Sequence, residues 1–273
     1  MAIIVSEKNV KKNQISDKSF KKIIFDQLNL PTTDIIFEKY VMSRDDLINL
    51  KAEADQCVWL MLLEGSAESS IDSIKGGSTL FLPPQKVLDL QPNDHCIFLK
   101  LTVNNFKKHS KDKGTNLETV HYDYLKEPVL NSEHDKRSRV YLASKELIKN
   151  SAFVSEIVTF PSQVKSSNHC HYDVEHFQFL LQGEGIVFLD NTPVKITKGD
   201  FVYKLDGEYH HVHNTGEDPL IFVEFFIPGI WETIWSDESK RCAWNPTGQN
   251  SLGTEPTRDI KSHISDGKIV EGV

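Results

Sequence analysis

The segment from Asn168 to Asn214 decides the fold of this chain, and it reads NHCHYDVEHFQFLLQGEGIVFLDNTPVKITKGDFVYKLDGEYHHVHN. It holds six of the chain's eleven histidines, set among short apolar runs with turns at Gly183 and Gly199. Neutral imidazole is the commonest protein ligand of first-row metal ions. Residues two apart in a strand point the same way, so an extended segment would aim His169 and His171 at one point. The segment therefore predicts β-structure that carries a metal site.

Length and charge narrow the class of protein. The 273 residues are enough for one large domain or two small ones, and the net charge of −8 gives no electrostatic support for a nucleic-acid or anionic-membrane partner. No apolar run is long enough to span a bilayer, and residues 1–12 do not have the charge order of a signal peptide. The four cysteines lack CxxC spacing, so we expect a reducing cytoplasm and no disulfide frame: Cys57, Cys96, Cys170 and Cys242.

The pattern along the chain predicts an all-β protein with additions at both ends. Short apolar runs broken by turn residues begin at Ile35 and are typical of antiparallel sandwiches and barrels. Before them we expect a short helix that begins near Ser16 or Asp17, with an apolar face of Phe20, Ile23, Ile24 and Leu28. The expected segments are an N-terminal helical or extended piece, a first barrel, a connection, a second barrel and a polar extended tail: 1–34, 35–104, 105–150, 151–236 and 237–273.

An internal repeat relates the two predicted barrels. Leu62-Leu63-Glu64-Gly65 matches Leu180-Leu181-Gln182-Gly183, and each is followed by a strand pair, a glycine turn and an aromatic strand. Alignment on these features gives the residues that stand in the first half in place of His169, His171, His176 and His210: Lys51, Glu53, Val58 and Leu88. A single carboxylate among them is not a coordination set. We expect the first barrel to be structural.

The histidine spacing resembles the first motif of the cupin superfamily, G-x5-H-x-H-x3–4-E-x6-G. His169 and His171 take the two histidine positions, and Gly183 takes the closing glycine. Gln163 replaces the first glycine, and His176 stands in the glutamate slot.

The second motif, G-x5-P-x-G-x2-H-x3-N, is matched from Gly199 through Gly207 and His210 to Asn214, with Leu205 in place of proline. The resemblance covers about residues 152–228, with a degenerate copy at 50–102. It implies a bicupin, two double-stranded β-helix barrels in tandem.

The resemblance implies a ligand set of His169, His171 and His210. The fourth ligand is His176 or, as its substitute, Glu175. Alternation along a strand puts His176 on one face and Glu175 on the other, and the family spacing favours His176.

A histidine-only set leaves the charge of a divalent ion uncompensated, which makes the ion a stronger Lewis acid. We expect Fe(II), with Zn, Mn or Ni as alternatives, because ligand type alone does not separate them. Three further residues on nearby strands are candidate catalytic groups. Glu224 is a lone charge in an apolar run and a candidate acid/base, and Tyr203 and Gln178 are candidate pocket residues.

Three functions are consistent with this pattern. The first is a mononuclear non-haem Fe(II) oxygenase, dioxygenase-like, that acts on a small polar metabolite. The second is a redox-neutral metal-dependent isomerase, cyclase, lyase or decarboxylase, which an inward Glu224 or Tyr203 would favour. The third is a non-catalytic small-molecule-binding cupin. We expect a small-molecule substrate and, from the exposed barrel edges and the polar tail, a homodimer.

Overall fold

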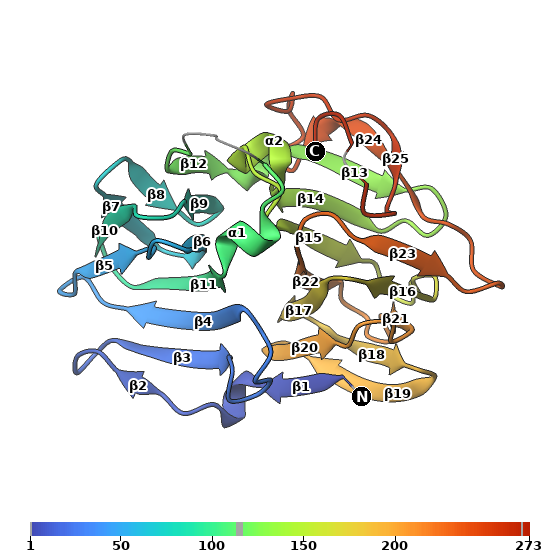
Figure 1. Ribbon diagram of the computed structural model, residues 1–273, viewed down its shortest axis with the longest axis horizontal. Coiled ribbons are helices and arrows are strands. Elements are labelled where there is room, and N and C mark those ends of the chain that lie inside the picture. The colour runs from blue at the N-terminus through green and yellow to red at the C-terminus, as the bar shows by residue number, and fades with distance from the viewer. Residues whose placement is uncertain (1, 113–116, 269) are drawn as a thin grey trace. The chain divides into compact units, whose positions relative to one another are not determined.

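The computed structural model describes residues 2–112, 117–268 and 270–273, and it consists mainly of antiparallel strands (Figure 1). The chain forms two compact units, Val5–Tyr124 and Leu125–Val273, the second of which also takes in Met1–Ile4. Each unit has a large and a small sheet, and each has a core cluster of buried apolar side chains. This arrangement confirms the predicted all-β fold with two barrels in tandem.

In the N-terminal unit, the large sheet has the order β12-β9-β6-β11-β4-β3-β2 and the small sheet the order β5-β10-β7-β8. Its interior is apolar and includes Leu60, Leu62 and Phe98. The element bounds are η1 (Glu7–Asn9), β2 (Asn13–Gln14), β3 (Phe20–Phe25), β4 (Ile35–Met42), β5 (Ile48–Lys51), β6 (Gln56–Glu64), β7 (Ser66–Ser69), β8 (Ser73–Lys75), β9 (Ser78–Leu82), β10 (Val87–Pro92), β11 (Cys96–Asn104), α1 (Phe106–His109) and β12 (Val120–Asp123).

In the C-terminal unit, the large sheet has the order β1-β20-β17-β22-β15-β14-β13-β24-β25 and the small sheet the order β19-β18-β21-β16-β23. The element bounds are β1 (Ile3–Ser6), η2 (Tyr124–Lys126), β13 (Pro128–Ser132), β14 (Ser138–Ala143), α2 (Lys145–Ile148), β15 (Val154–Phe160), β16 (His169–Tyr172), β17 (Glu175–Gln182), β18 (Glu184–Leu189), β19 (Thr192–Thr197), β20 (Asp200–Lys204), β21 (His210–His213), β22 (Leu220–Ile227), β23 (Glu232–Trp235), β24 (Ala243–Asn250) and β25 (His263–Ile264).

The internal repeat is visible in the backbone of both units. Gly65 and Gly183 have φ angles of +83° and +80°, in the left-handed region that favours glycine. The carbonyl of each accepts a hydrogen bond of 3.0 Å from the second turn of its repeat, from Gly76 N–H in one unit and Lys198 N–H in the other. The Leu-Leu-x-Gly segments therefore make the same turn twice, as the sequence predicted.

Gln163, which stands in place of the first motif glycine, has a backbone conformation that glycine favours. Gln163 has a φ angle of +63°, a region that non-glycine residues seldom occupy. The turn before β16 therefore has the positive φ angle that glycine would favour, although glutamine stands there.

The predicted N-terminal helix is wrong. Its central residues form β3, which pairs with β4 so that Phe20 lies opposite Val41. Leu28, which the helix would have packed inward, is 94% exposed. A helix of this length is marginal on its own, whereas β-branched and aromatic residues in this run favour a strand once a partner strand is available.

The structure also divides the chain differently from the expected segments. β12, in the expected connection, pairs with β9 in the N-terminal unit, whereas β13 and β14 belong to the C-terminal sheet. The expected polar tail contributes β24 and β25 to that sheet and buries Trp244 and Ile260 in its core. A strand with a polar outer face has few apolar residues, so composition alone hid its pairing.

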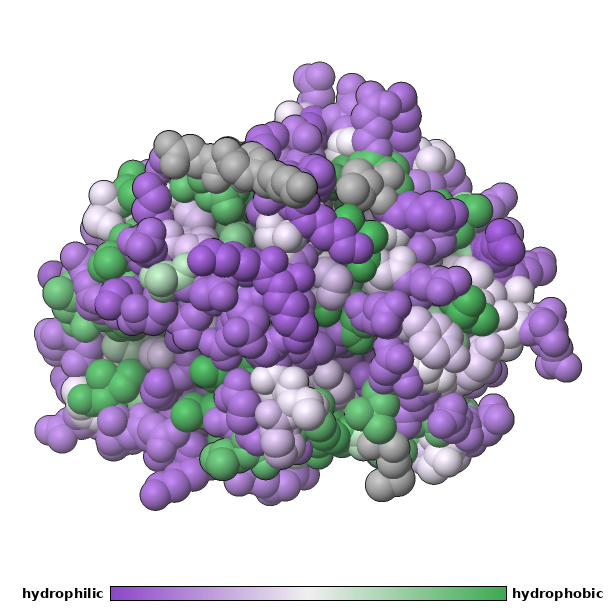
Figure 2. Space-filling model, viewed as in Figure 1, coloured by the Kyte–Doolittle hydropathy of each residue, from purple (hydrophilic) through white to green (hydrophobic). Residues whose placement is uncertain are grey.

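On the face seen in Figure 2, hydrophilic side chains predominate and hydrophobic ones are scattered between them. Within the described residues, no helix has both the length and the apolar character needed to cross a membrane. The homodimer expected from the sequence stays a prediction, which sedimentation of the purified chain would test.

Candidate metal centre

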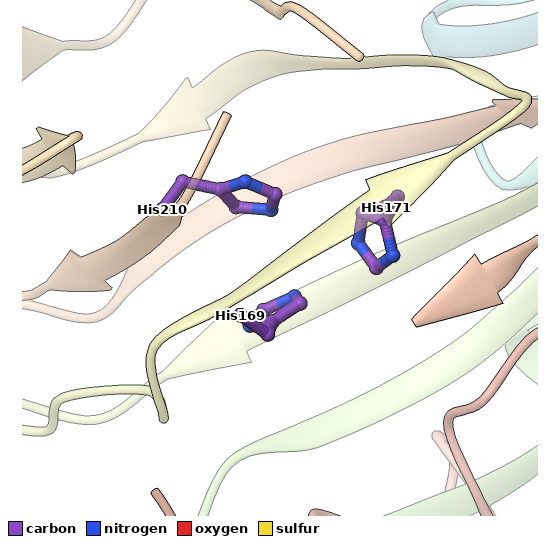
Figure 3. A group of neighbouring side chains, drawn as sticks. All are labelled: His169, His171 and His210. Atoms are coloured by element: carbon purple, nitrogen blue, oxygen red, sulfur yellow. The ribbon is translucent and has the colours of Figure 1, made fainter. Parts of the chain in front are cut away.

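Three imidazoles converge in the C-terminal barrel. His169 and His171 project from β16, and His210 begins the neighbouring strand β21, directly opposite His169 (Figure 3). The ring centroid of His169 lies 4.8 Å from that of His171 and 4.6 Å from that of His210. One nitrogen of each ring lies within 4.8 Å of the others. A small displacement would bring all three to the roughly 2.1 Å that a metal–nitrogen bond requires.

Hydrogen bonds fix which ring nitrogen faces the centre. Nδ1 of His169 lies 2.9 Å from the Ser167 carbonyl, and Nδ1 of His210 lies 2.9 Å from the Glu208 carbonyl. A carbonyl only accepts, so both Nδ1 atoms carry the proton and both Nε2 atoms carry a lone pair.

The third imidazole is held by a hydroxyl instead of a carbonyl. Nδ1 of His171 lies 3.0 Å from the Thr233 hydroxyl, which also accepts from Trp231 Nε1 at 3.0 Å. The Nε2 atoms of His171 and His210 are buried without a hydrogen-bond partner among the described residues. Buried acceptors of this kind are normally satisfied, so these orphaned nitrogens fit a bound cation.

His176 lies beside this group, and Glu175 points away from it. The ring of His176 is 4.7 Å from that of His171 and 4.9 Å from that of His210. Glu175 lies on the other face of β17, where its carboxylate accepts from Tyr203 Oη at 3.1 Å. Of the two candidates for the fourth position, only His176 faces the cluster.

The contacts of His176 assign its proton. Its Nε2 lies 2.6 Å from Oε1 of Glu224, which also accepts from Gln178 Nε2 at 2.5 Å. An ionised carboxylate only accepts, so Nε2 carries the hydrogen and the buried Nδ1 keeps the lone pair. Within the described part of the chain, Nδ1 has no hydrogen-bond partner. His176 is therefore oriented by a carboxylate, an arrangement common in histidines that bind metal.

A buried lysine completes the group around Glu224. Lys204 is 1% exposed, and its Nζ lies 3.6 Å from Glu224 Oε1 and 3.3 Å from His176 Nε2. Burial lowers the pKa of Lys204 to about 8, against the opposing charge of Glu224. Burial alone would raise the pKa of Glu224, but the hydrogen bond from His176 and the Lys204 charge lower it below its usual value. Glu224 is thus a carboxylate at neutral pH.

A second carboxyl lies directly across from the first. Glu156 on β15 is the register partner of Glu224, and Arg139 Nη1 donates to it at 2.9 Å. Burial, followed by the charge of Glu224, raises the pKa of Glu156 to about 7, although Arg139 opposes the shift. The two carboxyls can therefore share a proton near neutral pH, as paired acids do at other sites.

The imidazoles themselves resist protonation. Burial lowers the pKa of His169 to about 4 and that of His176 to about 3, and it also lowers the pKa of His171 and His210. All four are neutral well below pH 7, which is the form that binds metal.

These groups face one cavity inside the barrel. It has about 550 Å³ of empty space, of which the open mouth is part. Its wall contains His169, His171 and His210, and also both Glu156 and Glu224. Aromatic side chains close much of the remainder: Phe160, Phe222, Phe226, Trp235 and Trp244.

The structure does not bring Tyr203 to this cavity. It alternates along β20 with Val202 and Lys204, which face the interior, and its hydroxyl donates to Glu175 on the outer face. The prediction of Tyr203 as a pocket residue is therefore wrong, because strand alternation turns it away.

Two interior residues escaped the sequence analysis. Glu156 is a lone charge in the apolar run of β15, the same signal that identified Glu224, and it could have been found in the same way. Lys204 shares the inward alternation of Val202, but its place beside a glycine-containing turn disguised it as a solvated residue.

Comparisons with known proteins agree with this architecture. The cupin domain family matches residues 156–226. The oxalate-binding protein of Thermotoga maritima is 30% identical over 87 residues, which make up 32% of this chain and 72% of that protein. This chain belongs to the cupin superfamily. A further relative, an uncharacterised protein of Methanocaldococcus jannaschii, is 35% identical over 60 residues, which make up 22% of this chain and 48% of that protein. This chain therefore spans only about half the length of that relative.

Solved structures extend the similarity to both barrels of this cupin. Variants of Bacillus subtilis oxalate decarboxylase match with TM-scores of 0.68 at 15% identity, over 85% of this chain and 79% of theirs. At this identity the likeness concerns the fold, and the two matched barrels make this chain a bicupin.

Among the described residues of the N-terminal barrel, the positions that match the histidine cluster hold no metal ligand. Leu88 pairs with Leu50 as His210 pairs with His169. Ala52 O accepts from Gln85 N–H at 2.9 Å, as His171 O accepts from Gly207 N–H at 2.8 Å. The residues in the histidine positions are thus all buried and apolar: Leu50, Ala52, Val58 and Leu88.

One detail of the sequence alignment is wrong. It placed Lys51 and Glu53 in the positions of His169 and His171, one residue away from the true partners. These two side chains instead form an exposed ion pair of 3.0 Å. A shift of one residue moves a strand's side chains to the opposite face, so the error exchanged interior for exterior.

Proposed function

We propose that the C-terminal barrel is a metal-dependent enzyme centre that breaks a bond beside a carboxylate of a small anionic substrate without net oxidation. The class of reaction is that of a lyase or decarboxylase. The observation that carries the proposal is the buried Glu224, which shares one cavity with a cluster of neutral imidazoles. Among the described residues, the lone-pair nitrogens of His171, His176 and His210 have no hydrogen-bond partner. An inward carboxylate at this point supplies the acid/base group that such chemistry needs.

His169, His171 and His210 would hold the ion, with His176 as the fourth ligand. A bound divalent ion would supply positive charge that binds and polarises an anionic oxygen of the substrate. Mn(II) and Fe(II) suit the site best, because an octahedral ion keeps open positions with four protein ligands, and Zn and Ni remain alternatives. The names of the relatives, oxalate-binding protein and oxalate decarboxylase, support a small carboxylate as substrate.

The residues of the chain would divide the work between them. Gln178 and Lys204 hold Glu224 in place and keep it ionised. Aromatic side chains exclude water. When a carboxylate leaves as CO2, the bonding electron pair stays on the substrate carbon, which then takes up a proton. Glu224 and Glu156, side by side in the cavity wall, are the groups placed to hold and deliver that proton.

An Fe(II) oxygenase is the second candidate, and the histidine-only donor set favours it, because such a set leaves the ion its full charge. The two candidates differ in their use of oxygen. Protein prepared without chelators would be analysed for metal and then supplied with a panel of small carboxylates, with and without air. CO2 release that does not require O2 supports the lyase, and substrate-dependent O2 uptake with bound iron supports the oxygenase.

A variant of the acid/base group sharpens the test. Glu224→Gln keeps the shape and the hydrogen bond to His176, so bound metal should remain while turnover falls by about 100-fold or more. The exposed Glu184→Gln, on β18, serves as the matched control and should keep wild-type turnover. Full activity in Glu224→Gln, or a purified protein that binds no metal, would refute the proposed function.

A further inference from the structure

Away from the imidazoles, the same cavity has a second polar region. Arg137, Arg139 and Trp244 line it, and their exposed fractions are only 7%, 3% and 3%. The two guanidinium carbons lie 5.3 Å and 4.3 Å from the indole ring centroid of Trp244, so the three side chains form one group. Strands β14 and β24 and the residue before β14 position it.

Each arginine has protein partners for at least one terminal nitrogen. Arg137 Nη2 pairs with Asp135 at 2.7 Å and contacts Cys242 Sγ at 3.2 Å. Arg139 Nη1 donates to Glu156 at 2.9 Å, and its Nη2 lies 2.6 Å from His263 Nε2. These contacts hold both guanidinium groups in fixed orientations, so they do not turn freely to find other partners.

Three N–H donors of this group remain unused. Nε of Arg137, Nε of Arg139 and Nε1 of Trp244 are buried, and none of them has a hydrogen-bond partner in the part of the chain that the structure describes. Buried donors are satisfied in the great majority of cases. Three unsatisfied donors on side chains that line one cavity, two of them on cations, indicate that the missing acceptor is an anion that arrives with a ligand.

A neighbouring cavity, with about 490 Å³ of empty space including its open mouth, adjoins Arg139. It shares Arg139 and Ser265 with the metal cavity. Its wall also contains Lys145 and Lys268, and none of the described residues that line it is acidic, although Lys268 also pairs with Asp266. An anion would therefore meet positive charge along this approach, although the whole chain is acidic.

We propose that Arg137, Arg139 and Trp244 form a carboxylate subsite, so that the substrate carries two carboxylates, one for the imidazole cluster and one for this group. This inference rests on the proposed function and narrows its substrate class to dicarboxylates. The second carboxylate accepts the three unused N–H groups and fixes the orientation of the substrate. The cleaved bond is then the one beside the carboxylate at the imidazole cluster.

Matched ligands test this directly by calorimetry on zinc-loaded protein. The probes are malonate, succinate and glutarate, each with its monomethyl ester as a ligand of similar length that lacks the second charge. We expect the best dicarboxylate to bind at least about ten-fold more tightly than its half-ester, which equals ~1.4 kcal/mol. In Trp244→Phe and Arg137→Gln this advantage should shrink by about ten-fold, while binding of the half-ester stays unchanged.

The outcomes separate the two proposals. If zinc binds and the half-ester binds but the dicarboxylate has no advantage, the subsite is refuted and the metal centre survives. An advantage that persists in both variants also refutes the subsite. If the protein binds no metal, the proposed function fails, and dicarboxylate binding to metal-free protein, lowered by Arg137→Gln, still tests the subsite. The exposed Lys195→Gln is the control for general loss of positive charge.

Discussion

The two barrels of this chain share a turn geometry and a strand register, yet they use their interiors differently. Four positions that hold histidine in the C-terminal barrel hold leucine, alanine and valine in the N-terminal one. The N-terminal interior is an apolar core, with side chains such as Leu60, Leu80 and Leu90. The C-terminal interior keeps polar atoms for which the described residues provide no hydrogen-bond partner. The N-terminal barrel shows that the fold forms without the four histidines, so the unsatisfied polar set of the C-terminal barrel calls for a ligand.

The charged row of each barrel follows the same rule. Glu38 lies opposite Lys100 in the N-terminal barrel, as Glu156 lies opposite Glu224 in the C-terminal one. Glu38 has two cations, Lys100 at 2.6 Å and Lys21 at 2.7 Å, and its charge is balanced within the protein. Glu156 has one cation, Arg139, and faces a second carboxylate. The exchange of lysine for glutamate at one register position converts a structural ion pair into an acid pair.

The largest effect, on bound metal, is expected when the C-terminal barrel receives the residues that the N-terminal barrel has at the histidine positions. His169→Leu together with His210→Leu introduces the side chains of Leu50 and Leu88, and bound metal should fall at least about 100-fold, because two of the ligands are lost. The fold should persist, since apolar residues fill these positions in the other barrel. Metal analysis and circular dichroism measure the two results. A folded double variant that binds as much metal as wild type would contradict the assignment of His169 and His210 as ligands.

A smaller effect, on stability alone, is expected in the N-terminal barrel. Lys100→Met removes one of the two cations of buried Glu38, and we expect a loss of about 2 kcal/mol in the free energy of unfolding, less than for a carboxylate left with no partner. Chemical denaturation measures it. Lys86→Met breaks the exposed pair with Glu118 and should cost under about 1 kcal/mol. Metal content should match wild type in both variants. A loss of metal in Lys100→Met would contradict the assignment of metal binding to the C-terminal barrel alone.

The sequence predicted those features that depend on local pattern. Alternation and turn residues indicated the two barrels, and motif spacing brought His169, His171 and His210 together in one segment. The same alternation correctly separated His176 from Glu175, because both lie in one unbroken strand.

Features that depend on partners distant in the sequence were missed. The sequence pattern of β3 indicates a helix when its pairing with β4 is not known. The polar sequence of β24 does not indicate a strand without its pairing with β13. Arg139 joins the site through the register of β14 against β15, which no local pattern encodes. The one-residue error at Lys51 arose because the spacing before β6 differs by one residue from that before β17, and an alignment without register has no means of detecting it.

The smallest effect concerns pH and compares His176 with Val58, its counterpart in the N-terminal barrel. Burial, and then the charge of Lys204, lower the pKa of His176 in the fold to about 3, whereas the unfolded chain has a pKa of about 6.5. Below pH 6.5 the unfolded state therefore binds a proton that the folded state does not, so the metal-free protein loses stability as the pH falls. Between pH 6.5 and 5.5, protonation of this one residue in the unfolded chain should lower the free energy of unfolding by about 1 kcal/mol. His176→Val should remove this contribution from the dependence of unfolding free energy on pH. Urea unfolding followed by tryptophan fluorescence measures that dependence. Three of the four tryptophans belong to this barrel: Trp231, Trp235 and Trp244. An identical slope in the variant would mean that His176 takes up a proton within the fold and so does not stand ready as a neutral ligand.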